Sequence, residues 1–369
     1  MVQMVIKLHA SALCVIVLFT AISKAEDRVI TTAAGTGKTA NNGVSGSATA
    51  LNLPWPFGLA IGPNGGIYMT GCIHHRVWRM DPLTQQIQVV AGSGTKGWSG
   101  DGENPLKARM DQPYEVQLDE QGNMYIVEMA NHLIRKVDIA SQKIHTLAGD
   151  GVAGFRGDGD RAQNARFRSP HSIALDDRGY LYVADIGNHR VRRIDLRQLT
   201  IETISGTREP GFPLDGAPAK GSPLPGPRAL AVEKDSLWIV MREGHSLWRM
   251  DMNTRRLHHI AGTGVAGYSG DGFPAKEAQL NGPKGIAIGP DKDIFIVDSE
   301  NDCIRRIDRE TLIIDTVAGT GRSRTFSGDG GPARQSQLSQ PHGIVISPAG
   351  TVYIADTLNH RVRKFKRPE

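Results

Sequence analysis

Two histidines stand in matching positions of the sequence, each directly after a proline. His171 lies in Pro-His-Ser and His342 in Pro-His-Gly, and a short apolar stretch follows both. A neutral imidazole can bind a zinc ion or act as a general base. Two imidazoles are too few for a complete metal site. A zinc or calcium ion here would need carboxylate help, for which Glu115 and Glu128 are candidates.

Four further residues follow a proline in the same context, and their chemistry differs from copy to copy. They are Phe57, Tyr114, Arg228 and Lys284. A position with a purely structural role should hold similar residues in every copy, whereas this one holds five residue types in six places. Two His, one Tyr, one Arg and one Lys around a single opening suit a carboxylate, sulfate or sugar-acid ligand. The two cations would oppose a metal ion at the same place.

The matching positions arise because the sequence repeats itself at a regular interval. Each repeat contains a Gly-rich loop, a proline and four short apolar-rich stretches, always in the same order. An Ala-Gly or Ser-Gly pair ends the fourth stretch, and successive pairs are evenly spaced to within one position. Four short strands with turn signals between them, in units of about 57 residues, predict one blade of a β-propeller. The pairs begin at Ala34, Ala91, Ala148, Ser205, Ala261 and Ala318.

The two ends of the repeat region complement each other. The last repeat stops after its third stretch, at residues 361–366, and residues 28–33 supply a lone fourth stretch. Pairing the two would close the ring and remove two exposed sheet edges. We therefore predict an all-β fold, a six-bladed β-propeller over residues 26–369, with four-stranded antiparallel blades and closure by the N-terminal strand. A closed ring needs no partner for stability, so we expect a monomer.

The stretch YVADIGNHRVRRID at residues 182–195 carries a resemblance. With the AGTG, SGDG and Pro-x-Gly-Ile-Ala phrases, it resembles the NHL-repeat family of six-bladed propellers over essentially all of residues 26–369. That family includes scaffolds that bind proteins or RNA and also enzymes, so the resemblance implies the fold and leaves the activity open. The Pro-His units resemble those of peptidyl-hydroxyglycine amidating lyases, which place three such units around one zinc ion. Only two are present here, and the hub also loosely resembles gluconolactonase-type propellers.

Chain direction predicts which face of the ring carries a site. The post-proline residues, the second-strand ends, the Asn-His-Arg loops and the SGDG loops should share one face, and tight turns the other. Three second strands end in an Asp three residues before an Asn, and we expect these aspartates to accept backbone N–H groups of the loop. Glu128 stands at the strand end where three other blades have Asp. We therefore expect the backbone N–H groups of that loop to find other acceptors, and Glu128 to be a ligand-binding candidate. The three pairs are Asp185 with Asn188, Asp298 with Asn301 and Asp356 with Asn359.

Other repeated motifs have an ordinary structural interpretation. The Asp of each SGDG loop precedes a short helical turn, so we expect it to be an N-cap, and the sequence has no Gly-Lys-Ser/Thr phosphate loop. The third-strand arginines alternate with apolar residues, so half of them should point to solvent as a basic perimeter. The histidines of the Asn-His-Arg-like loops recur from blade to blade and should be structural, namely His75, His132, His189 and His360.

Residues 1–25 have the pattern of an export signal. Lys7 precedes an apolar stretch, residues 10–22, and Ser-Lys-Ala provides small residues before a cut ahead of Glu26. This stretch is too short to cross a bilayer, which takes about 20 residues, so we favour a cleaved signal over the alternative, an uncleaved anchor. Without residues 1–25 the formal net charge falls from +5 to +3, and so small a positive charge does not predict nucleic-acid binding. Two cysteines would remain, too few for a disulfide scaffold. We therefore predict a periplasmic or secreted chain.

Two classes of function fit these observations. The first is a binding module for a protein, a glycan or a small anion. The second is a hydrolase or lyase, either lactonase-like or amidating-lyase-like, with or without a metal at His171 and His342. In this enzyme one of the two histidines would be the base, and Arg228 or Lys284 would stabilise a developing anion. We favour the first class, because the sequence shows no recognised catalytic arrangement such as G-x-S-x-G. The predicted ligand-binding residues are Tyr114, Glu128, His171, Arg228, Lys284 and His342.

Overall fold

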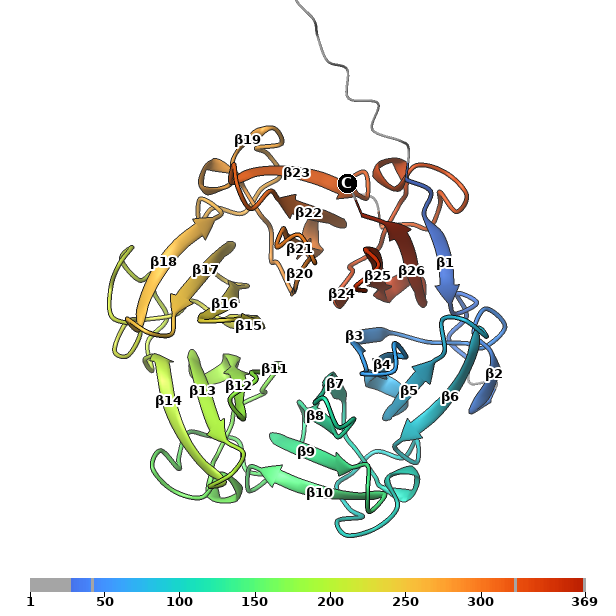
Figure 1. Cartoon of the computed structure of the whole chain (residues 1–369), viewed down its shortest axis with the longest axis vertical. Helices are drawn as coiled ribbons and strands as arrows, with labels where there is room; N and C mark the ends of the chain where they lie inside the picture. The colour runs from blue at the N-terminus through green and yellow to red at the C-terminus, as the bar shows by residue number, and fades with distance from the viewer. Residues whose placement is uncertain (1–27, 41–42, 322–323, 368–369) are drawn as a thin grey trace, which may run out of the picture.

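The computed structural model describes residues 28–40, 43–321 and 324–367. Six β-sheets surround a central axis, and the chain runs once around the ring (Figure 1). The prediction of an all-β, six-bladed propeller is thereby confirmed. Within the described ranges, no helix is long and apolar enough to span a membrane. The predicted export signal, residues 1–25, lies outside the described residues.

Each blade is an antiparallel meander that starts at the axis and ends at the rim (Figure 1). Blade 1 has β3 (Pro56–Ile61), β4 (Ile67–Gly71), β5 (Arg76–Met80) and β6 (Gln86–Ala91). Blade 2 has β7 (Pro113–Leu118), β8 (Met124–Glu128), β9 (Leu133–Asp138) and β10 (Lys143–Ala148). Blade 3 has β11 (Ser172–Leu175), β12 (Tyr180–Asp185), β13 (Arg190–Asp195) and β14 (Thr200–Gly206). Blade 4 has β15 (Pro227–Glu233), β16 (Ser236–Met241), β17 (Ser246–Asp251) and β18 (Arg256–Ala261). Blade 5 has β20 (Gly285–Ile288), β21 (Ile294–Asp298), β22 (Cys303–Ile307) and β23 (Ile313–Ala318). Blade 6 has β24 (Ile344–Ile346), β25 (Thr351–Asp356), β26 (Arg361–Lys366) and β1 (Thr31–Ala34).

Short 3-10 turns lie at two places in the repeat. Those after the second strand are η1 (Cys72–His74), η4 (Ile186–Asn188), η6 (Ser299–Asn301) and η8 (Thr357–Asn359). Those ahead of an inner strand are η2 (Pro105–Lys107), η3 (Ala162–Asn164), η5 (Ala275–Glu277) and η7 (Ala333–Gln335).

Blade 6 is completed by a strand from the other end of the chain. β1 pairs antiparallel with β26, placing Thr31 opposite Lys364 and Thr32 opposite Arg363. This is the closure that the repeat pattern predicts. Two blades have a fifth strand, at the rim, that the pattern does not predict. β2 (Ser45–Ser47) pairs with β6, and β19 (Phe273–Pro274) pairs with β23. These short strands cover the outer edges of their sheets.

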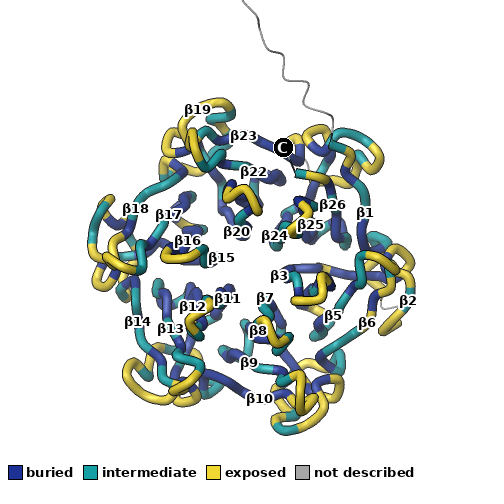
Figure 2. Tube along the Cα trace, viewed as in Figure 1, coloured by how far each residue is buried: buried dark blue, intermediate teal, exposed yellow. Residues whose placement is uncertain are grey.

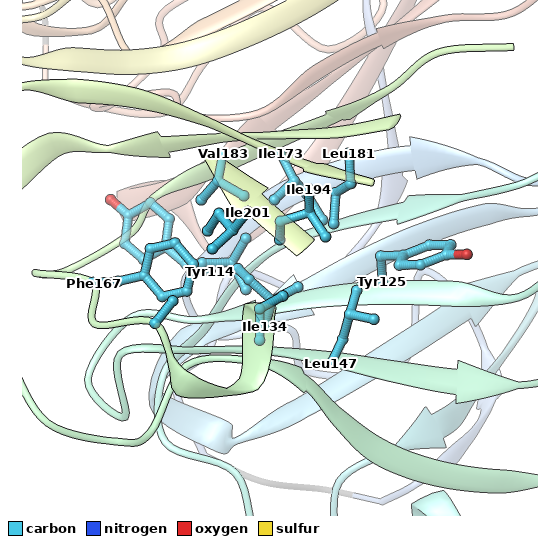
Figure 3. Close-up of a cluster of buried hydrophobic side chains, with 14 of the residues drawn as sticks. Tyr114, Tyr125, Ile134, Leu147, Phe167, Ile173, Leu181, Val183, Ile194 and Ile201 are labelled. Atoms are coloured by element: carbon cyan, nitrogen blue, oxygen red, sulfur yellow. The ribbon is translucent and has the colours of Figure 1, made fainter. Parts of the chain in front are cut away.

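The apolar core lies between neighbouring blades. Buried segments occupy the inner and middle strands, and the exposed segments are turns and rim loops (Figure 2). In one cluster, Ile134 and Leu147 of blade 2 pack with Ile173 and Val183 of blade 3 and with Phe167 from the loop between them (Figure 3). Because each sheet is covered on both faces, the middle strands bury side chains that point either way. The blades therefore hold the inner strand starts in fixed positions around the axis.

Four blades share a buried ion pair at mid-radius, which we call the belt. In each, the carboxylate at the end of the second strand lies against an arginine of the third strand. In blade 2, Arg135 Nη1 lies 2.8 Å from Glu128 Oε1, and Arg135 Nη2 lies 2.6 Å from Asp101 Oδ1. The belt consists of Glu128–Arg135–Asp101, Asp185–Arg192–Asp158, Asp298–Arg305–Asp271 and Asp356–Arg363–Asp329.

The belt arginines are the third-strand arginines that do not reach the expected basic perimeter. All four belt arginines have an exposed fraction of 0 %. The third strand lies inside its sheet, and neighbouring blades cover both of its faces, so alternation along this strand does not separate solvent from core. Burial raises the pKa of Asp185 to about 6, and its hydrogen bonds to Asn188 and the Arg168 N–H, together with the charge of Arg192, oppose that rise. The carboxylate is therefore ionised at pH 7 and neutralises its arginine.

The Asp of each SGDG-type loop has a different role from the one predicted. It pairs with the belt arginine, as Asp158 does with Arg192 at 2.9 Å, instead of capping a helical turn. η2 is capped by Asn104, and the turns η3, η5 and η7 have no side-chain cap. The predicted N-cap is therefore wrong, although the loops are structural as expected. Each loop brings a second carboxylate to a buried arginine.

Blades 1 and 4 lack the belt pair and carry a tryptophan in its place. Trp78 and Trp248 occupy the third-strand position of the belt arginines, and their second strands end in Gly71 and Met241. A Cβ at Gly71 would stand 2.1 Å from the ring of Trp78, so only glycine fits there. The indole ring thus fills the volume that the ion pair occupies elsewhere.

A second repeated contact joins each blade to the next at five of the six boundaries. In each contact, a loop side chain just before the third strand of one blade accepts a hydrogen bond from a backbone N–H of the next blade. The donor is the residue directly before the proline at the start of that blade's inner strand. We call these contacts latches. They are His75 with Gln112 N–H, His132 with Ser169 N–H, His245 with Gly282 N–H, Asp302 with Gln340 N–H and His360 with Trp55 N–H.

The latch is missing between blades 3 and 4. The buried Nδ1 of His189 has no hydrogen-bond partner among the described residues, because Gly226 N–H donates to Leu224 O instead. The structural interpretation of the loop histidines is thus confirmed by the latch for His75, His132 and His360, whereas His189 has the same left-handed conformation after its 3-10 turn without a latch.

Candidate functional site

The six post-proline side chains gather around the axis, where the inner strands begin. We call this set the hub ring. Its aromatic half packs closely, with ring centroids 4.7 Å apart for Phe57 and Tyr114, 4.3 Å for Phe57 and His342, and 4.5 Å for Tyr114 and His171. The hub ring consists of Phe57, Tyr114, His171, Arg228, Lys284 and His342.

The hub ring separates two cavities along the axis. The mouth cavity, about 440 Å³, lies toward the loops that follow the second strands and is bordered by Gly187, His189 and Glu243. The channel cavity, about 270 Å³, lies on the other side and is lined by the inner strands β3, β7, β11, β15, β20 and β24. Both cavities are bordered by four hub side chains, Tyr114, Arg228, Lys284 and His342. The mouth cavity lies on the face that chain direction predicts.

Arg228 is the most unusual charged group of the hub ring. Its exposed fraction is 3 %, and burial lowers its pKa. Its guanidinium stacks over the ring of Tyr114 at 4.6 Å and donates a hydrogen bond to the Tyr114 hydroxyl. Among the described residues it forms no ion pair, although Glu115 and Glu243 are near enough to act on its pKa. A buried cation without a contacting carboxylate favours an anion in the adjoining space.

Two further cations border the mouth cavity, and each has a carboxylate partner. Lys284 Nζ lies 2.8 Å from Glu300 Oε1, and burial, the largest influence, lowers the pKa of Lys284. Arg242 pairs with Glu243 at 3.1 Å, and both side chains are 43 % exposed. Together with Arg228, these groups give the mouth cavity three cations.

The two histidines are held in one tautomer. His171 Nδ1 lies 2.6 Å from Ser169 O, and His342 Nδ1 lies 2.8 Å from Gln340 O. A carbonyl oxygen only accepts, so Nδ1 carries the proton in both rings and Nε2 has a free lone pair. Burial, with added repulsion from Arg228 and Lys284, lowers the pKa of both imidazoles well below 6.5, so both rings are neutral at pH 7.

Below the hub ring, one carboxyl group faces the channel cavity. Ser172 Oγ donates to Glu115 Oε1 at 3.1 Å and accepts from Leu230 N–H at 3.0 Å, which ties blades 2, 3 and 4 together. Burial raises the pKa of Glu115 to about 7 against the opposing effects of the Ser172 hydrogen bond and the Arg228 charge. Glu115 therefore changes its charge near neutral pH.

The structure brings together five of the six residues predicted to bind a ligand. Tyr114, His171, Arg228, Lys284 and His342 all border the mouth cavity. The sixth, Glu128, is fully buried in the belt and borders neither cavity. It accepts hydrogen bonds from Asp111 N–H and Asn131 Nδ2, as its aspartate counterparts do from equivalent groups. The backbone donor lies 17 residues before each carboxylate and not, as predicted for the aspartates, in the loop that follows it. The expectation that this loop is satisfied otherwise is therefore wrong, because the longer glutamate reaches the same donors.

Sequence reasoning missed Arg242 and Glu243. Both lie in the loop after β16 and border the mouth cavity. A comparison of the loops position by position would have revealed Arg242, because the other blades hold uncharged residues there. These are Cys72, Met129, Ile186, Ser299 and Thr357.

The hub residues fit a metal ion poorly. Among the described residues, no group of three or more His, Cys, Asp or Glu side chains could hold a metal, so neither Glu115 nor Glu128 completes a set with the two histidines. Arg228 and Lys284 border the same space and would repel a divalent cation. The donor set is better suited to an anion.

Family comparisons agree with the repeat architecture. The NHL repeat signature matches residues 167–194 and 338–365, which hold the inner three strands of blades 3 and 6. The teneurin NHL domain signature matches residues 265–326. The two NHL matches fall on the blades that carry His171 and His342.

Whole-chain comparisons find relatives of low identity. The Arabidopsis thaliana protein SUPPRESSOR OF QUENCHING 1, chloroplastic is 26% identical over 328 residues, which are 84% of this chain and 30% of that protein. The chain spans about a third of the length of the first curated relatives that it matches, and less of others. An auxiliary nutrient binding protein from Bacteroides ovatus superposes with a TM-score of 0.67 at 19% identity, covering 93% of this chain and 77% of that one. A gluconolactonase from Xanthomonas campestris superposes with a TM-score of 0.54 at 14% identity, covering 86% and 89%. These structures share the fold.

Proposed function

Because the chain is an NHL-repeat β-propeller with a cationic hub, we propose that it is an exported binding module that takes a small anionic ligand in the mouth cavity. The observation that carries the proposal is Arg228, a buried guanidinium that contacts no carboxylate among the described residues. An ordinary structural arginine of this protein, such as Arg192, has two carboxylates. The missing counter-charge at Arg228 is the place that a ligand would fill.

The surroundings of Arg228 strengthen this proposal. Burial lowers the pKa of His171, and the charges of Arg228, Arg242 and Lys284, which border the same cavity, lower it further. A cavity of about 440 Å³ is large enough for a molecule of several non-hydrogen atoms. Partial enclosure weakens the screening by water and salt, so charge-assisted hydrogen bonds to an anion would be stronger here than at the surface.

Isothermal titration calorimetry tests the proposal directly. We expect a panel of small carboxylates and sulfate to include binders with dissociation constants in the micromolar to millimolar range, and Arg228→Gln to weaken binding at least tenfold. Arg249→Gln removes an arginine from β17 of the same blade, outside the mouth cavity, and should leave affinity unchanged. Unchanged binding in Arg228→Gln, or no binding of any anion by the natural chain, would reject this function.

One alternative is favoured by a specific observation. The neutral His171 and His342 could act as general bases beside Arg228 and Lys284, which would make the same site that of a hydrolase or lyase. Incubation with lactones and activated esters should then release acid at a rate that His171→Asn abolishes. A rate equal to buffer alone leaves the binding module as the function.

Export and a monomeric state belong to the same proposal and rest on the sequence pattern of residues 1–25 and the closed ring. Mass spectrometry of chain recovered from expressing cells should show a mature form that begins at Glu26. Sedimentation of that form should give the mass of one chain. An intact N-terminus in cell-associated protein would reject export.

A further inference from the structure

We propose that the ligand of the mouth cavity is a hydroxycarboxylate, a molecule with both a carboxylate and hydroxyl groups on neighbouring carbons. This inference rests on the proposed function and names the chemical class that the same site selects. It follows from the way in which the hub ring presents hydrogen-bond donors on one side and acceptors on another.

The donors of the hub ring come from blades 2, 4 and 5. Arg228 donates one N–H to the Tyr114 hydroxyl and keeps further N–H groups for a ligand. Tyr114 accepts that hydrogen bond, so its own O–H hydrogen is free to donate. Lys284 uses one N–H on Glu300 and retains two. These groups all satisfy an acceptor, and two of them are cations, so they fit a carboxylate.

The acceptors come from blades 3 and 6. In both His171 and His342 the Nδ1–H is committed to a backbone carbonyl, which leaves Nε2 as an acceptor. Neither Nε2 has a hydrogen-bond partner among the described residues, and both rings border the mouth cavity. Because both rings are neutral at pH 7, these two acceptors persist at physiological pH. They require a ligand that donates.

The two sets lie close enough for one small molecule to reach both. The centroid of the Tyr114 ring lies 4.5 Å from that of His171 and 6.4 Å from that of His342, and the Arg228 guanidinium lies 4.6 Å from the Tyr114 ring. Tyr114 is therefore the midpoint of the arrangement. A carboxylate at Arg228 would place hydroxyls on the adjacent carbons within reach of the imidazoles.

This arrangement discriminates among anions. Sulfate offers only acceptors, so its lone pairs would face the lone pairs of both Nε2 atoms. A plain alkyl carboxylate has no donor for either imidazole nitrogen, so any water that it displaces from them is not replaced, which costs free energy. An amine would donate to the imidazoles but would meet the three cations. A hydroxyl on the carbon chain satisfies the imidazoles without adding charge.

Matched pairs of acids test the inference by calorimetry at pH 7. The probes are glycerate with propanoate, L-tartrate and D-tartrate with succinate, and D-gluconate with hexanoate, together with sulfate. The two members of each pair have the same charge and carbon number and differ in their hydroxyls. We expect at least one hydroxy acid to bind ten times or more tighter than its unhydroxylated partner and tighter than sulfate.

Conservative variants assign that preference to the histidines. Asn can donate its amide N–H to the backbone carbonyl as Nδ1 does but provides no group at the Nε2 position, whereas Gln places an amide near Nε2. We expect His171→Asn and His342→Asn each to weaken the preferred hydroxy acid about tenfold while leaving its unhydroxylated partner unchanged. His171→Gln should retain more of the preference. Circular dichroism and melting curves confirm that each variant is folded.

The outcomes separate the two proposals. If no anion binds, the proposed function itself fails. If anions bind and their affinity depends on Arg228, the function stands. The hydroxycarboxylate class is nevertheless overturned if every unhydroxylated acid binds as tightly as its hydroxylated partner, or if sulfate binds as tightly as the hydroxy acids. The class is overturned as well if both Asn variants retain the full preference for the hydroxy acid.

Discussion

The belt and the hub ring are two rings built by the same repeat, and they differ in how their arginines are satisfied. In the belt, four blades repeat the same arginine, and each lies between two carboxylates. In the hub ring nearly every blade contributes a different residue, and Arg228 bonds to the Tyr114 hydroxyl and pairs with no carboxylate of the described residues. The belt arginines are therefore neutralised within the fold, whereas the hub ring retains unsatisfied groups that a ligand could use.

The largest effect should follow a change in the belt. Arg305 is fully buried between Asp298 and Asp271, and Asp298 is fully buried as well, so Arg305→Gln would leave the Asp298 carboxylate without its cation. Loss of one partner of a buried pair costs about 3–5 kcal/mol of unfolding free energy. Urea denaturation followed by circular dichroism measures this loss. A change below about 1 kcal/mol would show that the belt is not a stabilising element.

The latches should give an intermediate effect and provide a matched control within the chain. His132 and His189 occupy the same loop position with similar positive φ angles, 57° and 53°, but only His132 holds a latch. His132→Ala should therefore cost about 1 kcal/mol, the net value of one hydrogen bond, and His189→Ala much less. Equal losses in denaturant unfolding would show that the loop conformation, and not the latch, determines stability.

The hub arginine should have little effect on the fold. Arg228 is buried without a contacting carboxylate, so Arg228→Gln removes an uncompensated charge along with its contacts to Tyr114. We expect a change in unfolding free energy within about 1 kcal/mol, in contrast to Arg305→Gln. A loss as large as that of the belt variant would mean that Arg228 is mainly structural.

The smallest effect concerns pH. The pKa of Glu115 is raised by burial to about 7, so this group gains negative charge beside Arg228 as the pH rises through 7. Anion affinity should therefore fall a few-fold between pH 6 and pH 8, and Glu115→Gln should remove most of this change. Since the folded state holds this proton above the ordinary pKa of 4.5, the stability contribution of Glu115 declines as the pH rises from 4.5 toward 7. An unchanged pH profile in Glu115→Gln would exclude this role.

The repeat determined most of what could be predicted. Its constant spacing specifies the blade number, the order of strands and the closure of β1 on β26, because each blade must bury its faces against its neighbours. The face of the site followed from chain direction in the same way. Variation at the post-proline position then identified Tyr114, Arg228 and Lys284.

The errors have two causes. The belt arginines were not recognised because one of the two carboxylates at each arginine arrives from a loop much earlier in the chain, as Asp158 does for Arg192. Glu128 was assigned to the ligand because a change of residue type was taken as a change of role. The structure shows that one additional methylene still reaches Asp111 N–H and Asn131.

The most direct test compares the roles of the belt and the hub ring in one measurement. Thermal unfolding of the natural chain, Arg228→Gln and Arg305→Gln is recorded with and without the hydroxy acid that binds best. A ligand that binds only the folded state raises the melting temperature. We predict a rise for the natural chain and for the less stable Arg305→Gln, and a much smaller rise at the same ligand concentration for Arg228→Gln, whose melting temperature without ligand stays close to the natural value. A ligand-induced rise in Arg228→Gln equal to that of the natural chain would contradict this prediction.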